Sequence, residues 1–512
     1  MKRRDFLTRG VLRPIVTLVG GGAGLEIMLG EVFAEPRSCG PPPAAAPQRR
    51  TAAESLPPLP LPATPLRRSE KKRQPSPPSL IGKVILGDVK WVTENGQRSS
   101  YRDWMTDPSD MRNLLGWTNQ QLHIRYRVVD TSLTSFSYDP TELPVLYFTG
   151  HDAFTVPDEL IGKLRQFCTD GGTILGDACC GADAFDQAFR QFAQRLIPNR
   201  PMAVLPMDHP LYSSFYPISG VRYREEGKGE RDDLPKLEAV SLGCRAAVIY
   251  TGGYDCSCGW DGHVHEHGKR VLPGDARKLG ANIITYSLAT YELGRFLATE
   301  RVYHQTGQPT RDQLVIAQVI HDGDWDTQPS SLASLLKHLA ENTTVEVQFK
   351  KENVDLRSID AFAHPILYMT GHKDFTLSTE EVSNLRRYLA AGGVLVANAC
   401  CGRKGFDTAF RREIARVLPD QKLDRIAPDH PVYRSVFPIQ KVEYTPLVLH
   451  EHPGLSQPAL EGISLEKQLR VVYSPYGFVN GWSGAPNPYA REYEGKDALR
   501  LGINILVYAM TH

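Results

Sequence analysis

An internal repeat constrains the fold of this chain more than any other feature of its sequence. At an offset of 221 residues, positions 145–218 match positions 366–439 without a gap, and 30 of the 74 pairs are identical. Self-similarity over such a length indicates duplication of a whole structural unit. We therefore expect two tandem domains of one fold, over residues 80–300 and 314–512.

Each copy alternates short apolar runs with segments of helical spacing. In the first copy Val84–Gly87 and Val145–Phe148 are continuous apolar runs, as in strands buried on both faces. Residues 158–168 carry apolar side chains on one helical face, and Gly171-Gly172 ends that helix. This alternation predicts an α/β domain with a flavodoxin-like parallel sheet. Ligands of such sheets bind beyond the carboxyl ends of the strands, so the residues there are the candidates for function.

The beginning of the chain has the pattern of an export signal. Lys2-Arg3-Arg4-Asp5-Phe6-Leu7 is close to a twin-arginine motif, and a weakly apolar stretch and Val32-Phe33-Ala34 follow it. We expect residues 1–34 to be a twin-arginine signal peptide that directs the protein to the periplasm or otherwise out of the cytoplasm. Residues 35–79 are rich in proline and predict a disordered linker.

Charge and hydropathy narrow the classes of partner. Lys and Arg number 59 against 58 Asp and Glu, which leaves a net charge of +1 and no global field to attract nucleic acid. After residue 34 no apolar run reaches the roughly 18 residues that a membrane span needs, so we expect no transmembrane helix in the mature chain. A small-molecule, carbohydrate or peptide ligand fits this composition better.

Three short clusters that both copies share follow predicted strands or helices. They are Thr149-Gly150-His151, Ala178-Cys179-Cys180-Gly181 and Asp208-His209-Pro210 in the first copy, and Thr370-Gly371-His372, Ala399-Cys400-Cys401-Gly402 and Asp429-His430-Pro431 in the second. A cysteine at a strand-to-helix turn, with a histidine from another loop, is the arrangement that a thiol nucleophile needs. Adjacent cysteines have Cα atoms about 3.8 Å apart, so we expect no unstrained disulfide within either pair.

Roles follow for these residues on the catalytic interpretation. Cys179 and Cys400 would be nucleophiles, with His209 and His430 as their bases. The expected ligand-binding side chains are His151, Asp177, Asp208, His372 and Asp429. The alternative is structural: the cysteines pack as small apolar residues, and Asp-His-Pro forms a turn.

The two copies also differ at positions that matter for chemistry. In the first copy, six potential metal ligands lie within twelve residues, and the candidate set is Cys256, Cys258, His263, His265 and His267. Cysteine and histidine suit zinc or another transition metal. The second copy has Tyr476-Gly477-Phe478 there, so a metal would bind only the first copy; an exposed polar loop is the alternative. Asp177 is replaced by Asn398, and Gly87–Trp91 is expected to match His321–Trp325.

The repeated motifs together resemble one known family. The chain resembles the domain-of-unknown-function family 4159 in five motifs. These are Thr-Gly-His after a strand, Gly-Gly before the next strand, Phe-Asp-x-Ala-Phe-Arg at 185–190 and 406–411, Asp-His-Pro, and a closing Leu-Gly-x-Asn. The resemblance implies a class I glutamine-amidotransferase-like fold, in which a cysteine follows the corresponding strand within Gly-x-Cys-x-Gly. Cys179 and Cys400 match the Cys-x-Gly part of that motif, whereas the amidotransferase His-x-Glu motif has no evident counterpart.

Two hypotheses about function remain open at this point. The first is a non-catalytic ligand-binding or scaffolding module of the cell envelope, which duplication and a tether favour. The second is a thiol- or metal-dependent hydrolase that uses the cysteines and histidines at the strand ends.

Overall fold

A computed structural model describes residues 78–87, 89–94, 97–263, 267–298, 313–349 and 351–512. The expected signal peptide, nearly all of the expected linker and His265 lie outside this part of the chain.

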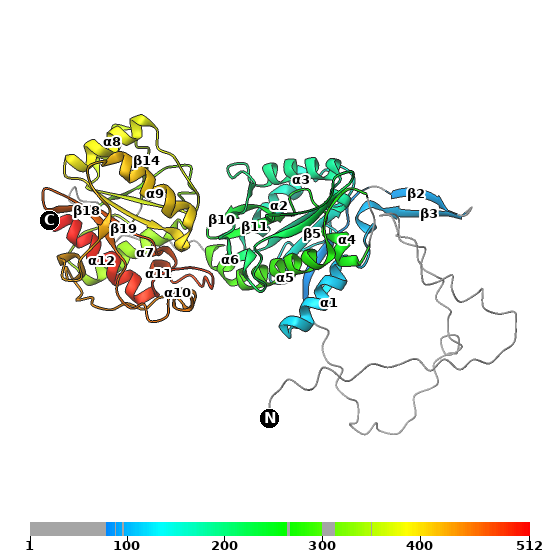
Figure 1. The fold of residues 1–512 in the computed structure, drawn as a ribbon. Helices are drawn as coiled ribbons and strands as arrows, with labels where there is room; N and C mark the ends of the chain where they lie inside the picture. Colours follow the sequence, from blue (N-terminus) through cyan, green and yellow to red (C-terminus); the bar gives the residue numbers. More distant parts are fainter. Residues whose placement is uncertain (1–77, 88, 95–96, 264–266, 299–312, 350) are drawn as a thin grey trace, which may run out of the picture.

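Two seven-stranded sheets form the centres of the two copies (Figure 1). The first has the order β4 (Arg127–Thr131), β1 (Ser79–Val84), β5 (Val145–Gly150), β6 (Thr173–Ala178), β11 (Arg245–Tyr250), β10 (Glu238–Leu242) and β7 (Ala203–Val204). The second repeats it with β14 (Glu352–Val354), β13 (Ile316–Val319), β15 (Ile366–Gly371), β16 (Val394–Ala399), β19 (Gln468–Ser474), β18 (Glu461–Leu465) and β17 (Asp424–Arg425).

The strand directions confirm the predicted fold class. In each sheet the first five strands run parallel, and the last two pair antiparallel at one edge. Taken along the chain, the parallel strands have the order 2-1-3-4-5 of flavodoxin-like domains. The chain therefore contains two tandem α/β domains of one topology.

Helices cover both faces of each sheet, because alternate strand residues point to opposite faces. In the first copy Leu146 and Phe148 pack against α2 (Asp158–Thr169) and α3 (Asp183–Leu196). Tyr147, between them, packs against α1 (Asp110–Leu122) and α5 (Pro273–Ala289) on the other face.

The second copy has the same two layers of helices. One face of its sheet carries α8 (Thr379–Ala390) and α9 (Lys404–Val417). The other carries α7 (Ser330–Asn342) and α12 (Gly495–Thr511). No helix among the described residues is long and apolar enough to cross a membrane.

The first strand lies earlier in the sequence than predicted. The apolar run Val84–Gly87 suggested a strand, but β1 ends at Val84. Leu80, Ile81 and Val84 are buried, whereas the chain emerges from the core after Val84. The apolar run therefore marks the end of the strand and the turn after it.

A hairpin after β1 changes how the two copies align. The strands β2 (Val89–Glu94) and β3 (Gln97–Arg102) pair antiparallel and form a separate two-stranded sheet. The segment that returns to the domain after them begins with Asp103-Trp104, which is 221 residues before Asp324-Trp325. The expected match of Gly87–Trp91 with His321–Trp325 is therefore wrong, because it aligned an inserted hairpin with a conserved turn of the repeat.

The two copies pack head to tail. The turn at Gly243-Cys244 precedes β11 and so lies at the amino edge of the first parallel sheet. Cys244 contacts Cys400, which follows β16 at the carboxyl edge of the second sheet. Figure 1 shows the β2–β3 hairpin, which follows β1, at the opposite end of the first copy. The carboxyl edge of the first sheet therefore faces away from the second copy, whereas that of the second sheet is covered.

Candidate functional site

Cys180 occupies a strained turn directly after β6. The turn Cys179–Gly181 connects β6 to α3, and Cys180 within it has φ 55° and ψ 11°. Side chains other than glycine rarely adopt this left-handed conformation, which tends to persist where the surrounding structure enforces it for function. A cysteine or serine held at a sharp strand-to-helix turn is the geometry of a nucleophile elbow. Cys401 repeats it with φ 54° and ψ 17°.

The imidazole of His151 faces the sulfur of Cys180. Its Nε2 lies 3.4 Å from Cys180 Sγ, and its Nδ1 lies 3.4 Å from Asp103 Oδ1 and from Thr106 Oγ1. His151 follows β5 and Cys180 follows β6, so two neighbouring parallel strands bring them to one edge of the sheet. The result is a Cys-His-Asp series with the histidine in the middle.

Asp103 is fixed in place by the backbone after β5. One of its oxygens accepts the N–H groups of His151 at 2.6 Å and Asp152 at 2.8 Å. Burial raises the pKa of Asp103, but the hydrogen bonds from His151 and from these N–H groups outweigh it and hold the pKa below its ordinary value. Gly150 makes this approach possible, since a Cβ there would lie 2.4 Å from Asp103 Oδ2. The repeated Thr-Gly-His motif is thus explained by close packing around its glycine.

A second carboxylate, Asp107, accepts hydrogen bonds from several side chains that lie close to Cys180. Its Oδ2 accepts from Cys179 Sγ at 3.1 Å, Ser257 Oγ at 3.0 Å and Cys258 Sγ at 3.5 Å. Its Oδ1 lies 2.7 Å from Nδ1 of His263. Cys179 is therefore a buried thiol that faces a carboxylate, and Cys180 is the cysteine that faces an imidazole.

The predicted ligand-binding residue Asp177 holds the loop beneath the site. It is fully buried, and its oxygens accept the N–H groups of Cys256 at 2.9 Å and Ser257 at 3.1 Å. Burial raises its pKa to about 7. Asp255 acts in a similar way, accepting the N–H of Cys180 at 2.7 Å and of Cys258 at 3.0 Å. Both carboxylates position the backbone that carries the sulfur atoms.

Part of the predicted metal set converges in the first copy. Of the groups in the described ranges whose ligand atoms lie within 4.8 Å of one another, two belong wholly to the first copy: Cys179, Cys180, Asp255 and Cys258, and Asp107, Cys258 and His263. Cys258 and His263 of the predicted set thus come together with residues from other loops.

Two other predicted metal ligands, Cys256 and His267, do not join these groups. Cys256 is fully buried and lies outside both of them. The side chain of His267 is 71% exposed and lies 3.7 Å from Glu226. The predicted set is therefore corrected: sequence proximity grouped residues whose side chains diverge.

His209 and His430 have a structural role in both copies. Each begins a short 3-10 turn, and its Nδ1 accepts the N–H two residues later, at 3.2 Å. Each ring packs on a tyrosine, Tyr286 or Tyr508. We therefore revise the predicted pairing of Cys179 with His209 and of Cys400 with His430, because the Cys179 thiol donates to Asp107 and the Cys400 sulfur lies beside Cys244, while each histidine caps a turn.

The aspartates of the Asp-His-Pro motifs also differ from expectation. Asp208 accepts the N–H of Lys404 at 3.0 Å, and its carbonyl accepts from Arg403 at 3.2 Å. It thus helps to join the copies. Asp429, its counterpart in the second copy, is exposed.

The second copy repeats the Cys-His-Asp series in a closed setting. His372 Nδ1 lies 2.7 Å from Asp324 Oδ2, and Arg200 of the first copy pairs with Asp324 at 2.6 Å. The side chain of His372 is 11% exposed, against 26% for His151. A cavity of about 40 Å³ at the boundary between the copies is lined by residues that include His209, Cys244 and His372. A cavity of this volume holds a few water molecules.

Sequence reasoning missed four residues of the first-copy site: Asp103, Asp107, Cys180 and Asp255. A signal for Asp103 was present, since Asp-Trp-x-Thr-x-Pro-Ser occurs at 103–109 and again at 324–330, at the offset of the main repeat. The Cys-x-Gly spacing of the amidotransferase resemblance selects Cys179 rather than Cys180.

Comparison with known proteins identifies the family. The model of the family described as Domain of unknown function (DUF4159) matches residues 93–288 and again 315–510. These matches cover more than half of the chain, so the chain belongs to this family and contains two copies of its domain. No curated protein matches the chain.

Proposed function

We propose that the first copy of this DUF4159 protein is a cysteine-dependent enzyme that cleaves an amide or ester bond. Cys180 is the nucleophile, His151 the general base and Asp103 the residue that orients His151. The observation that carries the proposal is the placement of His151, with Nε2 3.4 Å from Cys180 Sγ and Nδ1 facing Asp103. Nucleophile, base and orienting carboxylate in this order define thiol catalysis on many unrelated folds.

Each step of the reaction has a residue to perform it. His151 takes the proton of the Cys180 thiol, and the thiolate attacks the carbonyl carbon of the substrate. The bond to the leaving amine or alcohol breaks, and His151 returns the proton to that group. Water, deprotonated by His151, then hydrolyses the thioester and restores the thiol. Asp103, whose lowered pKa keeps it ionised, stabilises the imidazolium between these steps.

The surroundings of the sulfur restrict the substrate. Asp107 and Asp255 lie close to the cysteines of the site. Carboxylates at this distance repel an anionic substrate and favour a neutral or cationic one. We therefore propose a neutral or cationic amide or ester, which a peptide or an amino sugar derivative would satisfy.

A metal centre at the same place is the second candidate. The convergence of Cys179, Cys180, Asp255 and Cys258 favours it, since thiolate and carboxylate ligands suit zinc. Cys179, Cys180, Asp255 and Cys258 would hold a zinc ion there, and the ion would supply Lewis-acid chemistry beside His151 only if one of the four left a coordination position open. Removal of the metal would abolish such an activity, whereas the thiol mechanism would survive it.

The rate of Cys180 alkylation by iodoacetamide tests the thiol mechanism. We expect fast labelling of Cys180 at neutral pH and a rate at least about tenfold lower in His151→Asn, since the base that promotes the thiolate is lost. The matched control His430→Asn removes an imidazole that caps a turn and leaves this rate unchanged. A Cys180 that labels no faster than a free thiol in small peptides contradicts the thiol mechanism. Labelling that appears only after a chelator is added favours the metal centre.

The second copy fits the non-catalytic role that the duplication suggested. Its Cys401 is buried and its His372 is only 11% exposed beneath the first copy, which leaves little room for a substrate. We propose that it serves as a structural partner on which the first copy is mounted, and that the protein works outside the cytoplasm, as the twin-arginine pattern predicts.

A further inference from the structure

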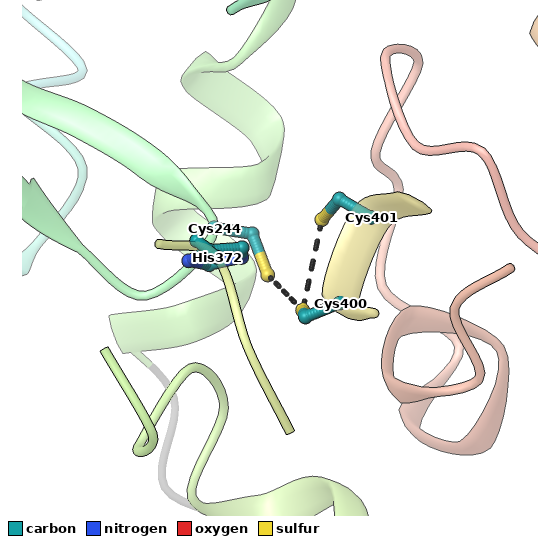
Figure 2. A group of neighbouring side chains, drawn as sticks. All are labelled: Cys244, His372, Cys400 and Cys401. Carbon is teal, nitrogen blue, oxygen red and sulfur yellow. Dashed lines mark hydrogen bonds between the residues drawn. The ribbon is translucent and has the colours of Figure 1, made fainter. Parts of the chain in front are cut away.

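Three cysteines and one histidine meet at the boundary between the copies. Cys244 comes from the turn between β10 and β11 of the first copy. His372, Cys400 and Cys401 follow β15 and β16 of the second copy. Figure 2 shows the sulfur of Cys244 directed at Cys400, with Cys401 on the same turn as Cys400. One ligand atom from each of the four residues lies within 4.8 Å of the others.

The distances between the sulfur atoms match a shared metal ion better than a disulfide. Cys244 Sγ lies 3.5 Å from Cys400 Sγ, and Cys400 Sγ lies 3.8 Å from Cys401 Sγ. A disulfide would bring two sulfurs to about 2.05 Å. Two thiolates that bind one tetrahedral zinc at about 2.3 Å are separated by about 3.8 Å. The cysteines therefore stand where zinc would hold them.

The histidine offers an independent indication of a missing ligand. His372 Nδ1 is held by Asp324, which leaves Nε2 for the sulfur cluster. That Nε2 is buried, and within the described part of the chain it lies beside the Cys401 thiol without a hydrogen bond of good geometry. A buried polar atom whose hydrogen bond is poorly made is costly. Metal-binding histidines commonly present one nitrogen to the metal while a carboxylate holds the other, as Asp324 does here.

Amide groups around Cys401 suit a charged sulfur. Asn480 and Asn487 direct their Nδ2 groups at Cys401 Sγ, at 3.5 and 3.3 Å. Donors of this kind stabilise a thiolate that binds a metal. All three cysteines are buried, so solvent has little access to their sulfur atoms.

The turn that supplies Cys244 has a counterpart that makes a useful comparison. In the second copy the same turn, between β18 and β19, carries Glu466 and Lys467. Both are exposed. A cysteine thus occupies the turn that faces the other copy, and a lysine occupies the equivalent turn that faces solvent.

We propose that Cys244, His372, Cys400 and Cys401 bind one zinc ion that joins the two copies. Four protein ligands and no open position define a structural zinc site rather than a catalytic one. The ion holds the β10–β11 turn of the first copy on the carboxyl edge of the second sheet. It also explains why the second copy retains its cysteine pair and histidine although no substrate reaches them. The site is separate from Cys180, and the proposed enzyme activity does not depend on it chemically.

Zinc content of the purified full chain, measured by mass spectrometry, tests this proposal. We expect the Cys244→Ser variant to contain one zinc equivalent less than the unaltered protein. Cys168→Ser is the control, because Cys168 is a buried cysteine of the first-copy core, and it should lose none. Cys258→Ser, in the first-copy site, should also retain the zinc that Cys244 binds. Cobalt bound in place of zinc should give thiolate-to-cobalt absorption, which Cys244→Ser weakens.

Three results would overturn the zinc site. The first is an unaltered protein that neither contains zinc nor takes up one equivalent when zinc is added. The second is a Cys244→Ser variant with unchanged zinc content and cobalt absorption. The third is a Cys244–Cys400 disulfide in the freshly purified protein. A Cys244→Ser variant that loses zinc while its Cys180 is still fully alkylated supports this zinc site and leaves the proposed enzyme activity untouched. The Cys180→Ser variant should keep the zinc bound by Cys244.

Discussion

Cys179 and Cys180 are neighbours in sequence, but their sulfurs lie in opposite chemical settings. Cys179 is buried and directs its thiol at the carboxylate of Asp107, which disfavours a thiolate. Cys180 is partly exposed and faces an imidazole, which favours one. Sequence spacing alone could not separate the two, because the difference arises from the left-handed backbone at Cys180.

Gly150 is the residue on which the position of Asp103 depends most directly. Gly150→Ala places a Cβ 2.4 Å from Asp103 Oδ2, so we expect Asp103 to move and unfolding free energy to fall by about 1–3 kcal/mol, as for other overpacked sites. Cys180 alkylation should slow as well, since His151 loses its anchor. Gly162→Ala in α2 is the control, because nothing lies within 4 Å of its added Cβ. It should raise stability by about 0.5–1 kcal/mol, and similar effects of the two variants would contradict this account.

His321 should make the second copy sensitive to acid. Its Nδ1 accepts the N–H of Gly323, and its Nε2 donates to the carbonyl of Thr370, both at 3.0 Å. Burial lowers its pKa to about 4, whereas an unfolded histidine titrates near 6.5. The unfolded state therefore binds the proton first, so stability is complete above about pH 6.5 and is lost as the pH falls toward 4.

The size of this effect follows from the shift in pKa. The pKa of His321 falls from 6.5 in the unfolded chain to about 4 in the folded protein. This difference corresponds to a loss of about 3 kcal/mol of unfolding free energy at the acid end of the range. Denaturant unfolding between pH 4 and 7 should show a steeper loss of stability for the unaltered protein than for His321→Asn. Parallel pH profiles of the two proteins would show that His321 is not the group responsible.

At the scale of elements, the start of α8 is better defined than its counterpart in the first copy. Ser378 and Glu381 form a reciprocal capping box, whereas Pro157 at the start of α2 makes no side-chain cap. Ser378→Ala should therefore lower unfolding free energy by about 1 kcal/mol. Ser383→Ala, at an exposed position within α8, should leave stability unchanged or slightly higher. Equal losses in both variants would mean that the cap contributes nothing.

Sequence patterns predicted some elements well and others poorly. Continuous apolar runs identified β5 and the strand after Gly171-Gly172, because buried parallel strands require such runs. The hairpin β2–β3 escaped prediction, since it lacks a core of its own. Because of the same inserted hairpin, the sequence alignment matched Gly87–Trp91 with His321–Trp325 and missed the correspondence of Asp103 with Asp324. His209 was misassigned for a different reason: a capping histidine and a catalytic one have the same sequence appearance.

At the scale of the whole molecule, head-to-tail packing makes the carboxyl edge of one copy accessible and covers that of the other. The carboxyl edge of the first sheet carries the accessible Cys180 and His151, and that of the second is covered by the first copy. Sequence comparison predicted the duplication and the shared residues. It could not predict their division into an open and a closed site, because that depends on how the domains pack.

The proposed export concerns the whole chain, and replacement of the arginine pair tests it. Replacing Arg3 and Arg4 together by lysine should retain the protein in the cytoplasm of a bacterium with a twin-arginine pathway. Cell fractionation with an antibody to the mature domains measures this. Unchanged export of the double variant would exclude the twin-arginine route. The single variant Lys2→Arg keeps the pair and should be exported normally.

Alkylation of the unaltered, folded protein, resolved by peptide mass spectrometry, tests the central claim most directly, since it compares the two copies in one sample. The account predicts that iodoacetamide modifies Cys180 quickly, while Cys400 and Cys401 stay protected until the protein is unfolded or its metal removed. Cys401 labelled as fast as Cys180, or Cys180 left unmodified while Cys401 reacts, would contradict it.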